Sequence, residues 1–343
     1  MPSSYNLVRG LALAGLIGLL NTFTFATNIV QNPGFEDRLN LWKVTLGATD
    51  LSNVYAAAAF RGTGPKNGRW LLTADVFSTT STQTLNTGEA SIEQALPAVR
   101  VADLKEVSVN FRGTTTSGYM LALVGFTDGT SASQIVVRYY QTFANWTKLD
   151  LTKMVKTAAN RDKQVARILF YFSEAWSYSG FALDDVVVDV ADPVSVSGQI
   201  SLGDFTGSVP PLLTLQLRPT EGGAPLTFNN VALNPDGTFT INARGLGEHK
   251  LHVRGGSFLG ALSDQPVILG GDSVGGLSVS LHNGDVDGDN AVTVFDYDAL
   301  SLAFDSVPGQ GNWNSRADLD GDGAVTVFDY DILSVNFDRI GVN

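Results

Sequence analysis

The stretch Asp285-Val-Asp-Gly-Asp-Asn-Ala-Val-Thr-Val-Phe-Asp296 decides the fold of the C-terminal part of this chain. A second copy, Asp318-Leu-Asp-Gly-Asp-Gly-Ala-Val-Thr-Val-Phe-Asp329, begins 33 residues later. Both copies place side-chain oxygens at loop positions 1, 3, 5, 9 and 12, with a backbone carbonyl expected at position 7, which is the pattern that calcium prefers. Position 6 is Asn290 or Gly323, residue types that tolerate the left-handed backbone of a sharp turn. The repeat therefore predicts two calcium loops.

Electrostatic repulsion makes a bound cation necessary in such loops. Once a loop closes, its four carboxylates lie within about 5 Å of one another, and each like-charged pair costs on the order of 3 kcal/mol at an effective dielectric constant near 20. The sum exceeds the stability of a small domain, so we expect cation binding and folding to be one event. All-oxygen ligands favour calcium over zinc or copper, and the ligand number disfavours magnesium.

The charge of the chain is concentrated in this region. The formal net charge is −12, and residues 285–343 contain twelve Asp, no Glu and two Arg, a net of −10 that leaves only −2 for the remainder. No basic cluster occurs, so the sequence gives no support to nucleic-acid binding. The chain has no cysteine and three histidines, which excludes thiolate chemistry and a His-rich zinc site.

Residues 1–26 have the composition of a secretory signal peptide. Arg9 supplies the positive charge, Leu11–Leu20 form the apolar segment, and Thr24-Phe-Ala26 is a plausible cleavage site. The alternative is an uncleaved membrane anchor, because the apolar run is only slightly short for a membrane span. No later stretch could cross a membrane, so we expect a secreted or cell-surface protein. Without disulfides, such a protein depends on large cores or on metal for its stability.

Residues 27–191 show short alternating strands separated by turn residues, which predicts a β-sandwich. The clearest strand patterns are Val107–Phe111, Tyr119–Phe126, Gln134–Tyr139 and Arg167–Phe172. The one helix candidate is Thr152–Ala159.

Four motifs of this region resemble the jelly-roll carbohydrate-binding modules and their galactose-binding-like relatives. They are Asn28-Ile-Val-Gln-Asn-Pro-Gly-Phe-Glu36 followed by Trp42, Ile92-Glu-Gln-Ala-Leu-Pro97, Trp146-Thr-Lys-Leu-Asp-Leu151 and Phe181-Ala-Leu-Asp-Asp-Val-Val-Val188. The resemblance implies a jelly-roll fold that binds a carbohydrate or a cell-surface glycan. It also implies an extra calcium ion held by Glu36 and by Asp185 or Asp184; because adjacent strand residues face opposite sides, only one of the two Asp can point at the ion. The alternative is that these Asp residues merely end a strand.

Sugars are usually bound on flat aromatic faces, and three residues are candidates for this role. Trp176 and Tyr178 fall in a predicted loop, where two aromatic side chains are seldom buried. Trp70 is a third candidate, although a lone strand aromatic more often belongs to the core. Trp42 and Trp146 follow the motif positions of the family and are expected in the core.

Residues 192–282 predict a second, smaller sandwich of the Ig-like or transthyretin-like type. Asp192-Pro193 marks the boundary, about seven strands follow, and Asn234-Pro-Asp-Gly237 is a strong turn signal. The stretch Gly271-Asp-Ser-Val-Gly275 fits the nucleophile-elbow pattern of hydrolases. That motif needs a strand-to-helix turn in an α/β sheet, so here we interpret it as a flexible turn.

Residues 283–343 resemble a type I dockerin, the duplicated calcium module that docks enzymes onto cohesin scaffolds. The resemblance rests on Asp at loop position 12 and on one apolar-periodic helix after each loop. It implies a small α-helical domain with two Ca²⁺ ions. The implied ligands are Asp285, Asp287, Asp289, Ala291 (carbonyl), Thr293 and Asp296 for one ion, and Asp318, Asp320, Asp322, Ala324 (carbonyl), Thr326 and Asp329 for the other.

Dockerins select their cohesin partly through loop positions 10 and 11. These positions are Val294-Phe295 and Val327-Phe328, which are apolar where the family often has small hydroxyl or charged residues. Exposed apolar pairs would be adhesive, so we expect them to be buried, either by a cohesin or by the neighbouring sandwich. The short junction His282–Gly284 favours packing against the sandwich.

Three functions are compatible with these patterns. The first is an exported, non-catalytic protein that binds a carbohydrate or surface ligand through the jelly roll. The second is a cellulosome-type subunit that docks a cohesin. The third is a polysaccharide-active enzyme, but the pairs Glu89/Glu93 and Glu36/Asp37 lack the alternating acidic strand of a jelly-roll glucanase. We therefore expect no enzymatic activity.

Overall fold

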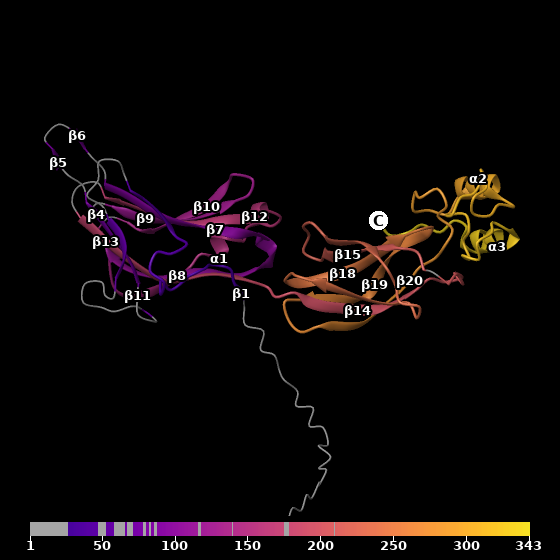
Figure 1. The fold of residues 1–343 in the computed structure, drawn as a ribbon, viewed down its shortest axis with the longest axis horizontal. Helices are drawn as coiled ribbons and strands as arrows, with labels where there is room; N and C mark the ends of the chain where they lie inside the picture. Colours follow the sequence, from indigo (N-terminus) through magenta and orange to yellow (C-terminus); the bar gives the residue numbers. More distant parts are fainter. Residues whose placement is uncertain are drawn as a thin grey trace, which may run out of the picture.

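The computed structural model describes residues 27–46, 53–57, 66, 71–77, 80–81, 84–85, 88–115, 118–138, 140–174, 178–208 and 210–343. The predicted signal peptide, residues 1–26, lies outside this set. Hydrophobic side chains gather in three main clusters, with members at 30–190, at 194–281, and at 286–333 together with Leu259. The parts that contain these clusters follow one another along the long axis of the molecule (Figure 1).

Residues 27–191 form the first sandwich, whose two sheets are antiparallel throughout. One sheet has the strand order β11–β8–β13–β4–β3 with β1 paired to β13, and the other has the order β10–β9–β12–β7–β2. The first sheet comprises β1 (Thr27–Asn28), β3 (Asn53–Ala57), β4 (Leu71–Phe77), β8 (Leu104–Thr114), β11 (Thr142–Asp150) and β13 (Tyr178–Val190). The second comprises β2 (Lys43–Leu46), β7 (Gly88–Arg100), β9 (Tyr119–Phe126), β10 (Ser131–Val137) and β12 (Gln164–Glu174), while β5 (Thr80–Ser81) and β6 (Thr84–Leu85) form a separate hairpin.

Alternate residues of these strands face one core, as the period-two pattern predicts. Phe170, Phe172 and Phe181 are completely buried in it, and Trp42 is 6% exposed against Phe35. Trp146 is only partly buried and packs on Leu71 in a small satellite cluster. The alternating pattern thus produces a mostly β architecture of packed sheets.

The predicted helix Thr152–Ala159 is mostly wrong. Helix α1 spans only Thr152–Val155, and a 3₁₀ turn, η2 (Ala158–Asn160), follows it; a second such turn, η1 (Val101–Asp103), joins β7 to β8. The Asp150 carboxylate accepts the Thr152 N–H at 2.8 Å and starts the turn. Val155 is completely buried, and the chain then becomes extended at Thr157, so the helix ends after one turn.

Residues 192–282 form the second sandwich, in which sheet β17–β14–β20 packs on sheet β16–β15–β18–β19. Its strands are β14 (Val194–Ser201), β15 (Leu213–Pro219), β16 (Leu226–Val231), β17 (Thr238–Ala243), β18 (Gly247–Gly255), β19 (Phe258–Leu269) and β20 (Val274–Ser280). Strands β14 and β20 pair in parallel, whereas every other pair is antiparallel. Ser273 lies in the turn between β19 and β20, and the chain continues as a strand. The hydrolase-type elbow is therefore absent at this position.

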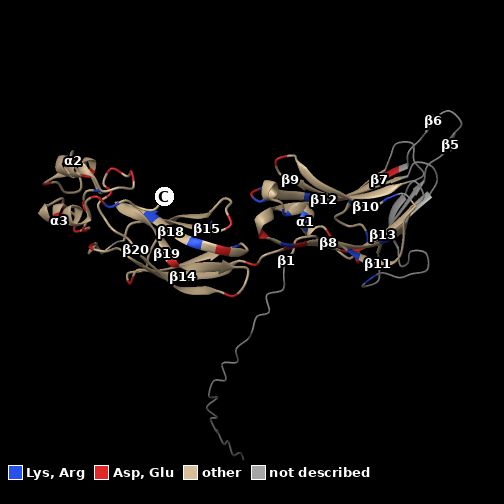
Figure 2. Ribbon diagram, turned by 180° about the vertical axis from the view of Figure 1, so that it is seen from behind, with Lys and Arg blue, Asp and Glu red and all other residues tan. Residues whose placement is uncertain are grey.

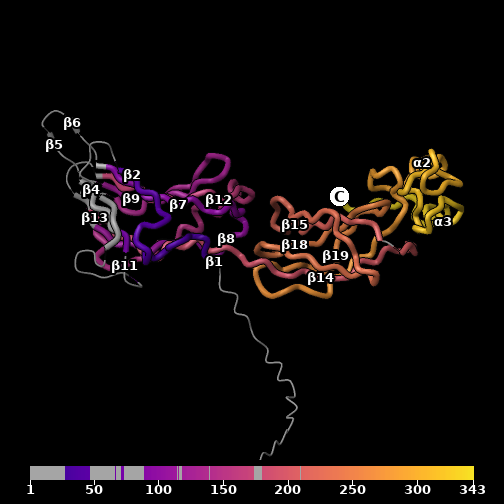
Figure 3. Tube along the Cα trace, in the orientation of Figure 1, coloured from indigo at the N-terminus to yellow at the C-terminus, as the bar shows by residue number. Residues whose placement is uncertain are grey.

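Residues 283–343, the loop–helix unit, contain loop 1 (285–296) followed by α2 (Val294–Ala303) and loop 2 (318–329) followed by α3 (Val327–Asn336). Leu300, Ala303 and Leu333 face a shared core that also contains Leu259 of β19. The unit thus packs on the second sandwich, and its C-terminal tail returns to that sandwich beside loop 1 (Figure 3). Among the described residues, no helix has the length and apolar character of a membrane span.

Candidate metal centre

The first carboxylates of each loop converge, as the repeat predicts. Side-chain oxygens of Asp285, Asp287 and Asp289 lie within 4.8 Å of one another, and those of Asp318, Asp320 and Asp322 do the same. No third acidic group of this compactness occurs in the described part of the chain. Asp and Glu are conspicuous in the loops next to α2 and α3 (Figure 2). Each of these two groups could hold a metal ion.

Hydrogen bonds from the backbone orient these carboxylates. In loop 1 the Asp287 Oδ1 atom accepts the Asp289 N–H at 3.0 Å, and the Asp289 Oδ1 atom accepts the Ala291 N–H at 2.8 Å. Asp320 and Asp322 make the same bonds in loop 2. Short acidic side chains favour such turns, because they bond to the backbone two residues further on. The spacing of the Asp residues therefore builds the loop as well as the acidic cluster.

Positions 9 and 12 have a role that the sequence reasoning missed. Thr293 and Thr326 are the N-cap residues of α2 and α3, and Asp296 and Asp329 complete a capping box with them. Asp296 and Asp329 are completely buried. Asp296 also accepts the Asp287 N–H, and Asp329 also accepts the N–H groups of Leu319 and Asp320, all at the start of the same loop. The last carboxylate thus ties the loop to the helix. The pattern Thr-x-x-Asp before an apolar run was the signal for this cap.

The residues fit a calcium ion, and loop 2 gives the clearest test. The Oδ1 atom of Asp318 is buried and has no hydrogen-bond partner, while its Oδ2 atom accepts the Gly323 N–H at 3.1 Å. Burial raises the pKa of Asp318 and of Asp329, and burial likewise raises the pKa of Asp287 in loop 1. A buried carboxylate oxygen without a partner is costly, and a hard divalent cation is the ligand that an all-oxygen donor set would satisfy.

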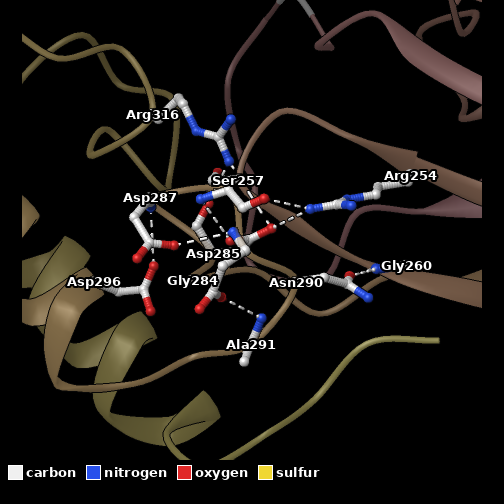
Figure 4. Close-up of polar contacts among 12 residues, drawn as sticks. Arg254, Ser257, Gly260, Gly284, Asp285, Asp287, Asn290, Ala291, Asp296 and Arg316 are labelled. Atoms are coloured by element: carbon white, nitrogen blue, oxygen red, sulfur yellow. Dashed lines mark hydrogen bonds and ion pairs between the residues drawn. The ribbon is translucent and has the colours of Figure 1, made fainter. Parts of the chain in front are cut away.

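Two arginines contact loop 1, and neither was predicted. The Nη2 atom of Arg254, on β18, lies 3.3 Å from the Asp285 Oδ2 atom and donates to the Gly288 carbonyl at 2.6 Å. The Nη2 atom of Arg316 donates to the Asp285 carbonyl at 2.7 Å and lies 3.9 Å from the same Oδ2 atom. Figure 4 shows the two guanidinium groups approaching Asp285 from different sides. The Asp285 side chain is only 1% exposed between them.

Position 6 of loop 1 also binds the second sandwich. The Asn290 Oδ1 atom accepts the Gly260 N–H of β19 at 2.7 Å, and its Nδ2 atom donates to Asn343 at 2.8 Å. Asn290 has a φ of 76° and is 1% exposed. The asparagine therefore serves both the turn and the contact between the unit and the sandwich, a role that Gly323 in loop 2 cannot have.

Loop 2 meets the sandwich through different groups. The N–H groups of Thr206 and Gly207 both donate to the Asp320 carbonyl, at 2.8 Å and 3.0 Å. The ring of Phe205 covers Gly321, where an added Cβ would lie 2.3 Å from a ring carbon. The sandwich thus contacts the two loops, loop 1 through side chains and loop 2 mainly through its backbone, and leaves the helices largely free.

The predicted burial of the Val–Phe pairs against the sandwich is wrong. Val294 and Phe295 are 54% and 65% exposed, and Val327 and Phe328 are 56% and 63% exposed. These residues occupy the first turns of α2 and α3, whose inner faces are formed by Leu300 and Leu333. Because the loops hold the contact with the sandwich, the short junction does not bury the apolar pairs.

In the first sandwich, Glu36, Asp184 and Asp185 surround Gly34. A Cβ added to Gly34 would lie 3.5 Å from the Asp184 Oδ1 atom, 3.7 Å from the Asp185 Oδ1 atom and 3.9 Å from the Glu36 Cγ atom. The expectation that only one of the two Asp could face this point is wrong. Strand β13 has a register shift here and Asp185 has a φ of 48°, which breaks the alternation.

Trp70 and Trp176 lie outside the described residues. Tyr178 is the first residue of β13 and pairs with Phe77, so its backbone belongs to a strand and not to the predicted loop. The sugar-binding role of these three residues stays a prediction.

No family model and no curated protein matches the sequence. Solved structures with partial likeness include an interface mutant of a type II cohesin–X–dockerin complex from Acetivibrio cellulolyticus (20% identity, 43% of this chain and 97% of that chain, TM-score 0.34). They also include TmCBM61 in complex with β-1,4-galactotriose (15% identity, 47% and 97%, TM-score 0.33) and the family 11 carbohydrate-binding module of a Clostridium thermocellum cellulosomal cellulase (12% identity, 50% and 93%, TM-score 0.27). Likenesses with TM-scores this low assign neither a ligand nor a partner to this chain.

Proposed function

We propose that this is an exported, non-catalytic binding protein whose C-terminal unit is held in shape by two calcium ions. The observation that carries the proposal is the duplicated carboxylate cluster, together with the buried Asp318 oxygen that has no partner. In each loop the ion would be held by the Asp residues at positions 1, 3, 5 and 12, with the hydroxyl at position 9 and the carbonyl at position 7 completing the set. Bound calcium would supply the positive charge that offsets the repulsion between these carboxylates.

A calcium titration of the full chain by isothermal calorimetry tests this proposal. We expect two ions per chain, and we expect Asp296→Asn and Asp329→Asn to remove one ion each. Asp298→Asn is the matched control, because Asp298 is an exposed residue of α2 outside the loop positions. A chain that binds no calcium, or that loses none in the two loop variants, would contradict the proposal.

A second candidate function is the docking of a cohesin-type protein on the unit. The exposed Val–Phe pairs at the two helix starts favour it, because they form two equivalent apolar patches, and exposed apolar patches often mark a protein–protein interface. Phe328 also lines a groove with Thr206 of the second sandwich.

A pull-down with purified cohesins tests this docking function. The double variant Phe295→Ala/Phe328→Ala should lose cohesin capture, since it removes most of both patches. Leu302→Ala, which removes an exposed leucine near the other end of α2, should retain it. Failure of the wild-type chain to recover any cohesin would contradict the docking function.

We also propose that the first sandwich binds a carbohydrate. This binding is supported by the jelly-roll resemblance of residues 27–191 and by the acidic residues gathered around Gly34, where Glu36 and Asp185 would hold a third calcium ion.

A glycan array probed with the full chain tests carbohydrate binding by the first sandwich. We expect binding of at least one glycan class and loss of that binding in Trp176→Ala, with Trp313→Ala in the distant C-terminal unit as the control. Unchanged binding in Trp176→Ala would place the sugar site elsewhere.

A further inference from the structure

The two loops offer different charge environments to a cation. In loop 1 both carboxylate oxygens of Asp285 already have partners: Oδ1 accepts the Gly288 N–H at 2.8 Å, and Oδ2 faces Arg254 and Arg316. In loop 2 the corresponding Asp318 has one buried oxygen without a partner. Within the described residues, no ion pair involves any carboxylate of loop 2.

The charge of Arg254 is directed at loop 1. Its only ion-pair partner among the described residues is Asp285, and its hydrogen bond to the Gly288 carbonyl fixes the guanidinium group beside the loop. A cleft of about 490 Å³ opens next to it, and no acidic side chain lines this cleft. Arg218 and Arg316 line it as well, and the Arg218 Nη1 atom donates to the Asn343 main-chain oxygen at 2.6 Å. The guanidinium group of Arg254 is therefore held in place beside loop 1, and among the described residues it forms an ion pair with no carboxylate other than Asp285.

We propose that Arg254 makes loop 1 the weaker of two unequal calcium sites, so that loop 2 fills first. The guanidinium group engages the Asp285 Oδ2 atom and adds positive charge beside the site, and both effects oppose a divalent ion. Because Arg254 belongs to β18, occupancy of loop 1 is also coupled to the seating of the unit on the second sandwich. This inference rests on the proposed function, namely that both loops bind calcium.

The size of the effect follows from Coulomb's law. A unit charge within about 6 Å of a divalent ion changes the affinity by on the order of tenfold, even at the dielectric constant of water. We therefore expect Arg254→Gln to tighten loop 1 about tenfold and to leave loop 2 unchanged. Arg254→Lys keeps the charge, so its loop 1 affinity should stay within about threefold of that of the wild type.

The experiment is a calcium titration of the full chain, with a competing chelator for the tighter site. The wild type should show two classes of site, and Asp296→Asn should abolish the weaker class while Asp329→Asn abolishes the tighter one. The matched control is Arg339→Gln, which removes the same charge from an exposed arginine that contacts His282. The tight class of loop 2 reports in every Arg variant whether the unit is still folded.

Each outcome decides the inference. Tighter loop 1 binding in Arg254→Gln, but not in Arg254→Lys or Arg339→Gln, supports it. Equal affinities of the two loops in the wild type would overturn the inference but leave the proposed function intact. Unchanged or weaker loop 1 binding in Arg254→Gln would do the same. The same holds if Arg254→Lys tightens loop 1 as much as Arg254→Gln does. Absence of any calcium binding overturns the proposed function itself, and the inference with it.

Discussion

Loop 1 and loop 2 have nearly the same sequence but different surroundings. Loop 1 is tied to the second sandwich by side chains, with Arg254 on Asp285 and Asn290 on Gly260, whereas loop 2 is contacted mainly on its backbone, at Asp320 and Gly321. An internal repeat therefore predicts that two sites have the same type of ligands, but not that they bind calcium with the same affinity. Substitutions at matched positions of the two loops can break or sharpen this comparison.

The largest effect is expected from the carboxylate at position 12. Asp329 accepts the N–H groups of Leu319, Asp320 and Thr326, and Asp296 accepts two such groups, those of Asp287 and Thr293. Leaving buried N–H groups unpaired costs about 1–3 kcal/mol each. Asp329→Ala should lower the free energy of unfolding of the unit by more than about 3 kcal/mol, and Asp296→Ala by about 1 kcal/mol less, measured by urea unfolding in calcium. An Asp296→Ala cost equal to or above that of Asp329→Ala would contradict this order.

The next effect concerns the glycine at position 4. Gly288 and Gly321 both have positive φ angles, 92° and 73°, so alanine is strained at either position. An added Cβ at Gly288 meets the flexible end of Arg316 at 3.1 Å, whereas at Gly321 it meets the Phe205 ring at 2.3 Å. Gly321→Ala should cost about 2–3 kcal/mol and Gly288→Ala about 1 kcal/mol in the same measurement. Adding Phe205→Ala to Gly321→Ala should recover part of the loss; no recovery would refute the ring contact.

Exchanging the residues at position 6 should have a smaller effect on stability, and only the exchange in loop 1 should be destabilising. Asn290→Gly removes the bonds to Gly260 and Asn343 and should cost about 1–2 kcal/mol. Gly323→Asn should change stability by less than about 0.5 kcal/mol, because an added Cβ at Gly323 meets nothing within 4 Å and asparagine tolerates the left-handed backbone. Thermal unfolding of the two variants in calcium checks this, and equal losses would mean that Asn290 only forms the turn.

The smallest effect is a pH dependence at the tail beside loop 1. His252 is buried, its Nε2 atom lies 2.8 Å from the Val342 carbonyl, and burial lowers its pKa. The pKa of His252 in the folded chain lies below its value in the unfolded chain, which is about 6.5. Its contribution to the free energy of unfolding is therefore complete above pH 6.5 and is lost as the pH falls from there through the folded-state pKa. The unfolding midpoint of the second sandwich should therefore decrease between pH 7 and pH 5, and less so in His252→Asn. Burial also lowers the pKa of His249, which accounts for the remaining slope.

The sequence predicted the strands and the acidic clusters because both depend on local patterns. Alternation located the strand Tyr119–Phe126, and the regular Asp spacing located both carboxylate triads. The contact that distinguishes the loops could not be read in this way, since Arg254 lies 31 residues before Asp285 on a different element. The exposed Val–Phe pairs were mispredicted because a short junction was assumed to press helices onto the sandwich, where the loops lie instead.

The most direct test of the central claim, that calcium holds the loop–helix unit, is hydrogen exchange of the full chain in calcium and in EGTA. The unit should lose the protection of α2 and α3 in EGTA, because the unscreened carboxylates open both loops, while β18 of the sandwich stays protected. Equal protection of α2 and α3 in calcium and in EGTA would contradict the claim.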